Sequence, residues 1–203
     1  MNNILELFPT VIGRYKMAYE QNELDFVMSL NRIKNIGNNY ADDFYVLKQE
    51  KLVRLKKFFK QSIEDYFSTV YEPTQKVKLK ITQSWINYTK DNEYHHDHAH
   101  GNSFISGVYY FKTTGETDGI NLYNQFKPII DSGYFDFSKT NNHYNVSEVN
   151  LPVEPGLLYL FPSRLVHGVS KNKTNNLRVS LSFNTFFKGK IGEVKALTYL
   201  NIK

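Results

Sequence analysis

Polar and apolar side chains alternate without a break along Leu177-Arg178-Val179-Ser180-Leu181-Ser182-Phe183-Asn184. Successive side chains of a β-strand point to opposite faces, so the four polar residues share one face and the four apolar residues share the other. Where two sheets pack together, one face of such a strand belongs to the core and the other faces solvent or a pocket. The stretch therefore predicts a half-buried strand that carries Arg178 on its polar face.

Strand-like patterns fill the rest of the chain after Pro73. They occur at residues 77–81, 84–88, 104–111, 120–123 and 157–161, with turns at Thr114-Gly115 and Asp118-Gly119. Before Pro73 the apolar residues recur at steps of three and four instead, which predicts helices over residues 20–34 and 47–70. The second helix is the clearer one, because it has Leu52, Leu55, Phe59, Ile63 and Tyr66 in register. The expected fold class is α+β, with N-terminal helices packed on one face of a β core.

Length and composition predict one globular domain over residues 1–203, with a mainly helical part at 1–72 and the β core at 73–203. The chain has no cysteine, so it has no disulfide and no thiolate metal ligand, which fits a cytoplasmic protein. Its first residues lack the features of a signal peptide, and no apolar window is long enough for a membrane span. The net charge of +5 is mild, and no recognised nucleic-acid motif accompanies it, so nucleic-acid binding is not supported.

Four of the six histidines fall in the run His95-His96-Asp97-His98-Ala99-His100, and a fifth, His167, lies far downstream. Imidazole is the commonest metal ligand among side chains. On an extended segment His98 and His100 point to the same face and can meet one ion. The same alternation puts His96 with them and puts His95 and Asp97 on the opposite face. The sixth histidine, His143, is expected to be an ordinary loop residue. The cluster favours a metal site over a solvated loop, and by itself it permits zinc, iron or no metal.

Arg178 follows His167 by eleven positions. A guanidinium binds a carboxylate through two parallel hydrogen bonds, and the hydroxyl of Ser180 is expected on the same face of the strand. An arginine and a hydroxyl close behind a metal-binding histidine would anchor a dicarboxylate at the metal.

These residues lie in blocks that resemble the iron(II)/2-oxoglutarate-dependent oxygenases, and most closely a 2OG-Fe(II) oxygenase family of marine phages and bacteria. The blocks are Leu7-Phe8-Pro9-Thr10, Trp85-Ile86-Asn87, His98-Ala99-His100-Gly101-Asn102-Ser103-Phe104-Ile105-Ser106-Gly107-Val108-Tyr109-Tyr110, Gly156-Leu157-Leu158-Tyr159-Leu160-Phe161-Pro162-Ser163-Arg164-Leu165-Val166-His167 and Arg178-Val179-Ser180-Leu181-Ser182-Phe183-Asn184. Their order and spacing match over nearly the whole chain. The resemblance implies a double-stranded β-helix (jelly roll) that binds Fe(II) and 2-oxoglutarate.

One position departs from the wider superfamily, because His100 stands where an aspartate or glutamate is usual. Two histidines and one carboxylate are the ordinary iron set in such oxygenases. Either His98, His100 and His167 form a three-histidine set, or Asp97 supplies the carboxylate. The alignment of the blocks favours the three histidines, and no catalytic side chain is expected beyond the metal ligands. Candidates for the pocket wall, which could equally be ordinary strand residues, are Trp85, Asn87, Tyr109 and Asn184.

The resemblance implies a hydroxylase-type oxygenase that uses O₂ and 2-oxoglutarate to oxidise a substrate C–H bond, with release of succinate and CO₂. The first alternative is a cupin-like three-histidine dioxygenase that does not use 2-oxoglutarate, and the second is a non-enzymatic jelly-roll binding module. Succinate formation distinguishes the 2-oxoglutarate-dependent oxygenase from the cupin-like dioxygenase. Residues 118–153 and the N-terminal helices are the expected specificity elements, because loops on a rigid scaffold carry specificity. The expected location is the cytoplasm, which would be that of the host cell for a phage protein.

Overall fold

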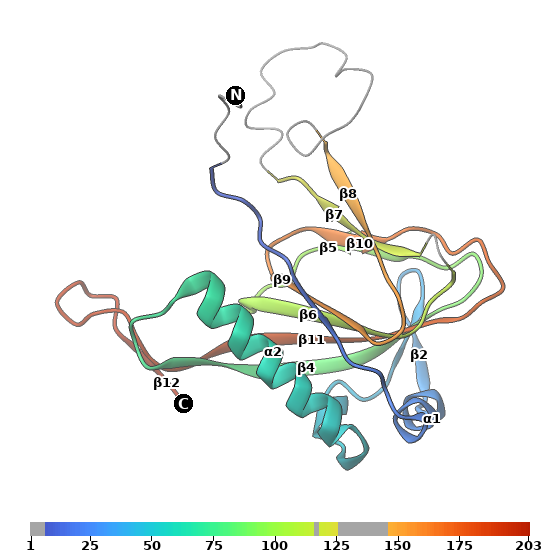
Figure 1. Cartoon of the computed structure of the whole chain (residues 1–203), viewed down its shortest axis with the longest axis horizontal. Helices are drawn as coiled ribbons and strands as arrows, with labels where there is room; N and C mark the ends of the chain where they lie inside the picture. Colours follow the sequence, from blue (N-terminus) through green and yellow to red (C-terminus); the bar gives the residue numbers. More distant parts are fainter. Residues whose placement is uncertain (1–6, 116–117, 126–145) are drawn as a thin grey trace, which may run out of the picture.

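The fold is a jelly roll in which two antiparallel sheets stack face to face (Figure 1). The computed structural model describes residues 7–115, 118–125 and 146–203. Within these ranges the larger sheet has eight strands and the smaller sheet has four. The predicted α+β class with a jelly-roll core is confirmed.

The larger sheet has the strand order β1-β9-β6-β11-β4-β3-β2, with β12 paired to β11. Its strands are β1 (Gly13–Lys16), β2 (Arg32–Lys34), β3 (Asn39–Ala41), β4 (Val77–Thr89), β6 (Ile105–Lys112), β9 (Leu157–Pro162), β11 (Arg178–Ile191) and β12 (Leu200–Ile202). The smaller sheet has the order β5-β10-β7-β8, with β5 (His95–His98), β7 (Gly119–Tyr123), β8 (Glu148–Pro152) and β10 (His167–Val169).

The long helix α2 (Val53–Tyr71) covers the outer face of the larger sheet (Figure 1). The residues that predicted it by their spacing are all buried, namely Leu52, Leu55, Phe59, Ile63 and Tyr66. Two short 3₁₀ helices, η1 (Val46–Lys48) and η2 (Glu50–Leu52), replace the expected first turns. The helix ends at Glu72, whose φ of 39° is left-handed and whose N–H donates to the Ser68 carbonyl before Pro73 stops the chain from continuing.

The first 72 residues contain strands as well as helices. The helix α1 (Gln21–Ser29) is shorter than the predicted segment 20–34, whose last part forms β2. Strand β1 forms one edge of the larger sheet, while β3 and β2 form the other. Strands of three or four residues are too short to show an alternating pattern, so the sequence did not reveal them.

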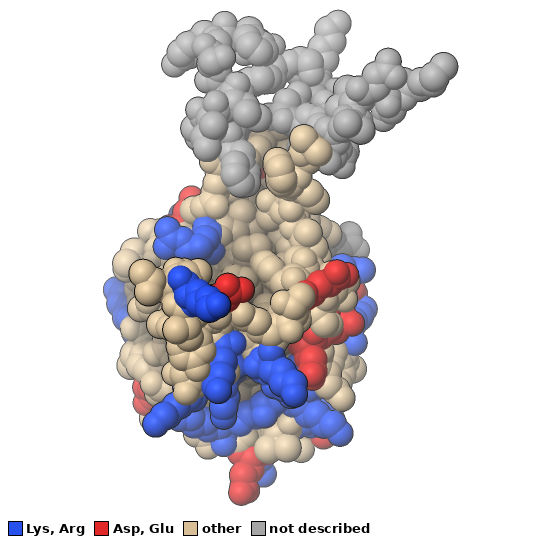
Figure 2. Space-filling view, turned by 90° about the vertical axis from the view of Figure 1, so that its left-hand side faces the viewer, with Lys and Arg blue, Asp and Glu red and all other residues tan. Residues whose placement is uncertain are grey.

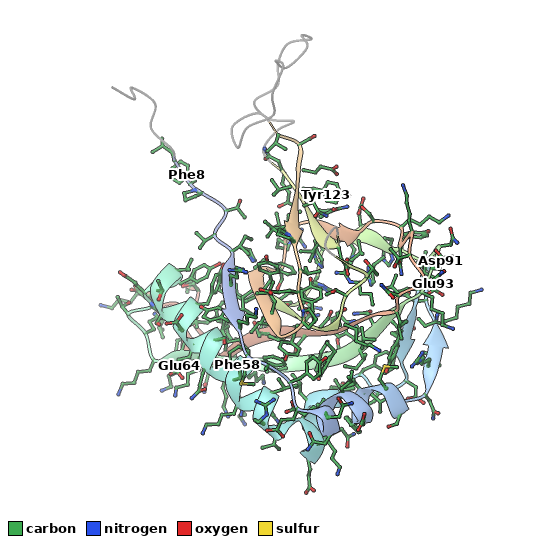
Figure 3. All side chains as sticks on the ribbon, turned by 45° about the vertical axis from the view of Figure 1, so that its right-hand side comes forward. Phe8, Phe58, Glu64, Asp91, Glu93 and Tyr123 are labelled. Carbon is green, nitrogen blue, oxygen red and sulfur yellow. The ribbon has the colours of Figure 1, made fainter. Side chains whose placement is uncertain are left out.

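Two apolar clusters hold the layers together. The larger one lies between α2 and the larger sheet, where Phe59 stacks on Phe183 with ring centroids 5.1 Å apart. A Cβ at Gly107 would lie 2.2 Å from the Phe183 ring, so only glycine allows this packing. The smaller cluster includes Tyr110, Ile120 and Phe161. Figure 3 shows Phe58 on the α2 side and Tyr123 at the opposite, smaller-sheet side, with side chains filling the space between.

Replacing Phe59 by alanine should strongly destabilise the protein. The ring is fully buried and contacts both Phe183 and Tyr109. Removal of such a ring from a core costs about 3–5 kcal/mol of unfolding free energy, which denaturant unfolding would measure. The half-buried neighbour Phe58 is the matched control, and Phe58→Ala should cost clearly less. Equal losses in both variants would contradict this account of the core.

No helix within the described residues combines the length and the apolar character needed to cross a lipid bilayer.

Candidate metal centre and its cavity

A bulge in β5 sets the geometry of the histidine cluster. His98 pairs directly with His167 of β10, but Val169 pairs with His95, so His96 and Asp97 together oppose Gly168. A β-bulge inserts one extra residue and redirects the side chains on either side of it. As a result, His95 lines the same cavity as His98 and His100, whereas His96 does not. The predicted alternation, with His96 beside His98 and His95 opposite, was wrong.

His98, His100 and His167 offer one ring nitrogen each within 4.8 Å of one another. Their ring centroids lie 4.4 Å apart for His98 and His167, 4.8 Å for His98 and His100, and 5.1 Å for His100 and His167. His167 is buried and the other two are half-buried. Among the described residues, this is the group of potential ligands close enough to hold one ion.

Backbone carbonyls fix the tautomers of two of these rings. Nδ1 of His98 lies 2.8 Å from the carbonyl oxygen of His96, and Nδ1 of His167 lies 2.9 Å from that of Leu165. A carbonyl only accepts, so Nδ1 carries the proton in both rings and Nε2 keeps its lone pair. Such second contacts orient metal-binding histidines and set which nitrogen meets the metal.

The three imidazoles are neutral at ordinary pH. Burial, together with the neighbouring histidines, lowers the pKa of His100 to about 3 and that of His167 to about 4. Burial also lowers the pKa of His98. Only a neutral imidazole has a lone pair for a metal, so proton competition with a metal is weak here.

A network of serines fixes the segment that carries His100. The His100 N–H donates to the Ser163 carbonyl at 2.8 Å. The buried Ser163 hydroxyl contacts those of Ser103 at 2.7 Å and Ser106 at 2.8 Å. Ser106 in turn donates to Oδ1 of Asn184 at 2.8 Å. Asn184 therefore supports the histidine segment rather than lining the cavity.

Asp97, the alternative ligand, is exposed and stands apart from the three histidines. Its carboxylate lies against Gly168, where a Cβ would be 2.1 Å from Oδ1 of Asp97. His143 lies outside the described residues.

The histidines open into a cavity between the two sheets. Trp85 and Asn87 line it as expected, together with Arg178 and Ser180. Tyr109 does not, because it points to the other face of β6, contacts Phe59, and donates its hydroxyl to the Met17 carbonyl at 2.7 Å. Tyr110, the next residue in the chain, lines the cavity instead. The remaining lining residues are Asn38, Thr89, His95, Ser106, Gly107, Val108, Ile120, Phe161, Gly168, Val169 and Ser182.

Arg178 is buried and already has an acidic partner. Its Nη1 donates to the carboxylate of Asp118 and, at 2.9 Å, to the carbonyl of Gly119. Both charged side chains are almost wholly buried, with exposures of 3% and 5%. Sequence reasoning missed this role of Asp118 because the residue stands beside a glycine and was assigned to a turn.

Tyr110 was also missed, and it carries an unpaired donor. Its hydroxyl is buried and makes no hydrogen bond within the described residues. Arg178 lies over its ring, 5.1 Å from the centroid, but a guanidinium only donates and so gives the hydroxyl proton no acceptor. Burial raises the pKa of Tyr110, which keeps this proton in place. The cavity therefore presents a guanidinium and a free phenol donor, which together suit a bound carboxylate.

A family model described as "Putative 2OG-Fe(II) oxygenase" matches residues 83–184, half of the chain. The matched segment contains the three histidines, Arg178 and Ser180. No curated protein matches the chain.

Several solved structures share the fold. One is the epimerase SnoN from nogalamycin biosynthesis, described as non-heme and α-ketoglutarate dependent, with a TM-score of 0.61, 11% identity and coverage of 87% of this chain and 78% of SnoN. HygX from Streptomyces hygroscopicus, solved with nickel, 2-oxoglutarate and hygromycin B bound, has a TM-score of 0.57 and 12% identity, with coverage of 87% of this chain and 82% of HygX. A 2OG-Fe(II) oxygenase family oxidoreductase from Burkholderia pseudomallei has a TM-score of 0.55 and 11% identity, with coverage of 85% of this chain and 84% of that protein. At these identities the likeness establishes the fold alone.

Proposed function

The chain belongs to the 2OG-Fe(II) oxygenase family, a family of oxidoreductases, and on this premise we propose that it is an Fe(II)- and 2-oxoglutarate-dependent oxygenase with a three-histidine iron site. His98, His100 and His167 would hold the iron, and Arg178 and Ser180, with Tyr110, would bind 2-oxoglutarate.

The main observation behind this proposal is that three ligand nitrogens lie within 4.8 Å of one another, at the wall of a cavity that Arg178 also lines. The neutral imidazoles and the carbonyl contacts of His98 and His167 support metal binding. The exposed position of Asp97 favours His100 over a carboxylate as the third ligand.

When bound, iron and 2-oxoglutarate supply the oxidative chemistry, in which decarboxylation to succinate and CO₂ is coupled to O₂-dependent oxidation of a substrate C–H bond. The side chains of the chain bind and orient these groups. Arg178 offers its remaining guanidinium donors to the far carboxylate, and the unpaired hydroxyl of Tyr110 adds a donor beside it. The apolar rings of Phe161 and Trp85 limit access of water to the histidines.

The charges of the cavity balance in an unusual way. A set of two histidines and one carboxylate leaves Fe(II) with one net positive charge, and an unpaired arginine adds a second. Here three neutral imidazoles leave both charges on the metal, while Asp118 cancels the charge of Arg178. Both arrangements give two positive charges, which match the two negative charges of 2-oxoglutarate. We infer that Asp118 supplies the negative charge that a carboxylate ligand would otherwise bring to the metal. It supplies this charge beside Arg178, at the far end of bound 2-oxoglutarate.

The proposed activity is tested by incubating the protein with Fe(II), O₂ and 2-oxoglutarate and measuring succinate. The proposed function predicts iron-dependent succinate release above that of a metal-free control. Oxygen consumption without succinate would instead indicate the cupin-like dioxygenase. Absence of iron binding would indicate a non-enzymatic binding module.

We also propose that residues 1–203 act as one domain, in which the strands and helices of 1–72 complete the jelly roll of 73–203. A cytoplasmic location is supported by the lack of cysteine, and a source among marine phages or bacteria by the resemblance of the sequence blocks. The location would be the host cytoplasm if the protein is phage-encoded.

A further inference from the structure

The cavity-facing side of the larger sheet continues beyond the cavity along β4 and β11. Residues of β11 alternate without a break from Ser182, which lines the cavity, through Asn184 and Phe186 to Lys188 and Lys190. The extra residue at the register shift near residue 183 lies in β4, because Phe183 pairs with Ser84 and Thr185 with Ile81. Directly paired residues share a face. Lys80, opposite Phe186, and Lys78, opposite Lys188, therefore also lie on this side.

Four lysines on this face, Lys78, Lys80, Lys188 and Lys190, form what we call the lysine ladder, and all four are exposed. Like charges that pair directly across two strands destabilise a sheet, and Lys78 pairs directly with Lys188. Neither strand contains an acidic residue. Within the described ranges Lys78, Lys188 and Lys190 form no ion pair, while Lys80 donates to the main-chain oxygen of Lys203 at 2.8 Å.

The ladder lies at the end of the molecule where β12 and the chain's last residues are found (Figure 1). Figure 2 looks onto this end and shows more Lys and Arg than Asp and Glu on the lower half of the face. From Ser182 to Lys188 is six strand residues, or roughly 20 Å at about 3.3 Å per residue. The ladder thus places a group of positive charges on the same side of the sheet as the cavity, farther along β4 and β11.

Two aromatic side chains accompany this group of charges. Phe186 lies within the ladder and is half-buried. Trp85 lies at the cavity end, where its ring centroid is 5.8 Å from that of His100. Lysines that follow a backbone of phosphates, combined with rings on which bases stack, are the usual means of binding single-stranded nucleic acid.

The cavity itself contains an acceptor with no donor. Asn87 is 7% exposed, and its Nδ2 donates to Ser182, but its Oδ1 has no hydrogen-bond partner among the described residues. A group with N–H donors would satisfy this oxygen, and the edge of a nucleobase carries such donors. A base inside a duplex cannot reach a buried site unless it leaves the stack, which favours a single strand.

We propose that the lysine ladder binds the phosphates of a single-stranded nucleic acid and directs one base into the cavity. This names the substrate class and rests on the proposed oxygenase function for the reaction, but the binding itself does not depend on that function. The sequence did not support nucleic-acid binding because the two lysine groups lie about a hundred residues apart and carry no motif; they come together only through the pairing of β4 with β11.

The test is fluorescence anisotropy of a labelled single-stranded oligothymidylate with the full chain, over a series of salt concentrations. The variant Lys78→Glu/Lys188→Glu should weaken binding at least tenfold. Each lost phosphate contact lowers the slope of log K against log salt by about 0.7 for a single strand, so the slope should fall by about 1.4. The control is Lys57→Glu/Lys60→Glu on α2, at the outer face of the larger sheet, which makes the same change in net charge. It should leave affinity and slope near those of the unaltered protein.

Phe186→Ala provides the second arm. It should weaken oligonucleotide binding but not binding of polyglutamate, which has no bases to stack. Equal losses in the ladder and control variants, or no binding at low salt, would overturn the proposal. So would polyglutamate binding as tightly as the oligonucleotide, which would indicate an acidic peptide. Failure of succinate formation with oligonucleotide binding intact would reject the oxygenase proposal and leave the binding site standing.

Discussion

Replacing His167 by alanine is expected to abolish both iron binding and 2-oxoglutarate turnover. His167 supplies one of three ligand nitrogens, and its ring is oriented by the Leu165 carbonyl. Loss of a residue that merely orients a ligand lowers metal affinity 10- to 100-fold, so loss of the ligand itself should lower it by more than about 100-fold. Iron content after equilibration with Fe(II), together with the rate of succinate release, would measure both effects.

The matched control is His96→Ala. His96 comes from the same histidine run, but its side chain does not line the cavity, and the carbonyl that contacts His98 belongs to the main chain. The control should keep iron and turnover. Full iron occupancy in His167→Ala would remove His167 from the ligand set, and loss of iron in His96→Ala would show that the cluster binds metal in another arrangement.

Replacing Arg178 by alanine should raise the KM for 2-oxoglutarate and destabilise the fold, for separate reasons. A hydrogen bond to a charged group contributes about 1.5–3 kcal/mol, so loss of the guanidinium should raise KM roughly 10- to 100-fold. The same change leaves Asp118 buried without its cation, which costs about 3–5 kcal/mol of unfolding free energy.

The double variant Arg178→Ala/Asp118→Asn separates these two effects. Removal of the Asp118 charge should restore most of the lost stability, as measured by denaturant unfolding, while the KM for 2-oxoglutarate stays high. If the double variant regained the low KM, Arg178 would not bind the cosubstrate. If the single variant were as stable as the unaltered protein, the two buried charges would not depend on each other.

The single variant Asp118→Asn isolates the charge of the pair. An asparagine oxygen can still accept from Nη1 of Arg178, so the guanidinium keeps its position. The charge balance proposed for the cavity then predicts tighter 2-oxoglutarate binding, because the arginine would no longer be neutralised.

The periodic elements of this fold could be predicted from the sequence because their patterns are local. The apolar spacing that predicted α2 and the alternation that predicted β11 each follow from one buried face. The pairing of His98 with His167 brought together two of the expected ligands, and Arg178 and Ser180 fall on the expected face of β11.

The differences come from non-local pairing. The bulge in β5 exists only in its register with β10, so the sequence could not indicate that His95 would replace His96 in the cavity. Both faces of β6 are buried, so burial does not distinguish the side of Tyr109 from that of Tyr110. The pairing of Arg178 with Asp118 spans sixty residues and has no sequence signature.

The most direct test of the three-histidine iron site is an anaerobic titration with Fe(II) and then 2-oxoglutarate, followed by visible absorption. We expect a metal-to-ligand charge-transfer band upon addition of 2-oxoglutarate to the unaltered protein, and no band in His167→Ala. Iron binding without the band would contradict the use of 2-oxoglutarate, and a band of full intensity in His167→Ala would contradict the site.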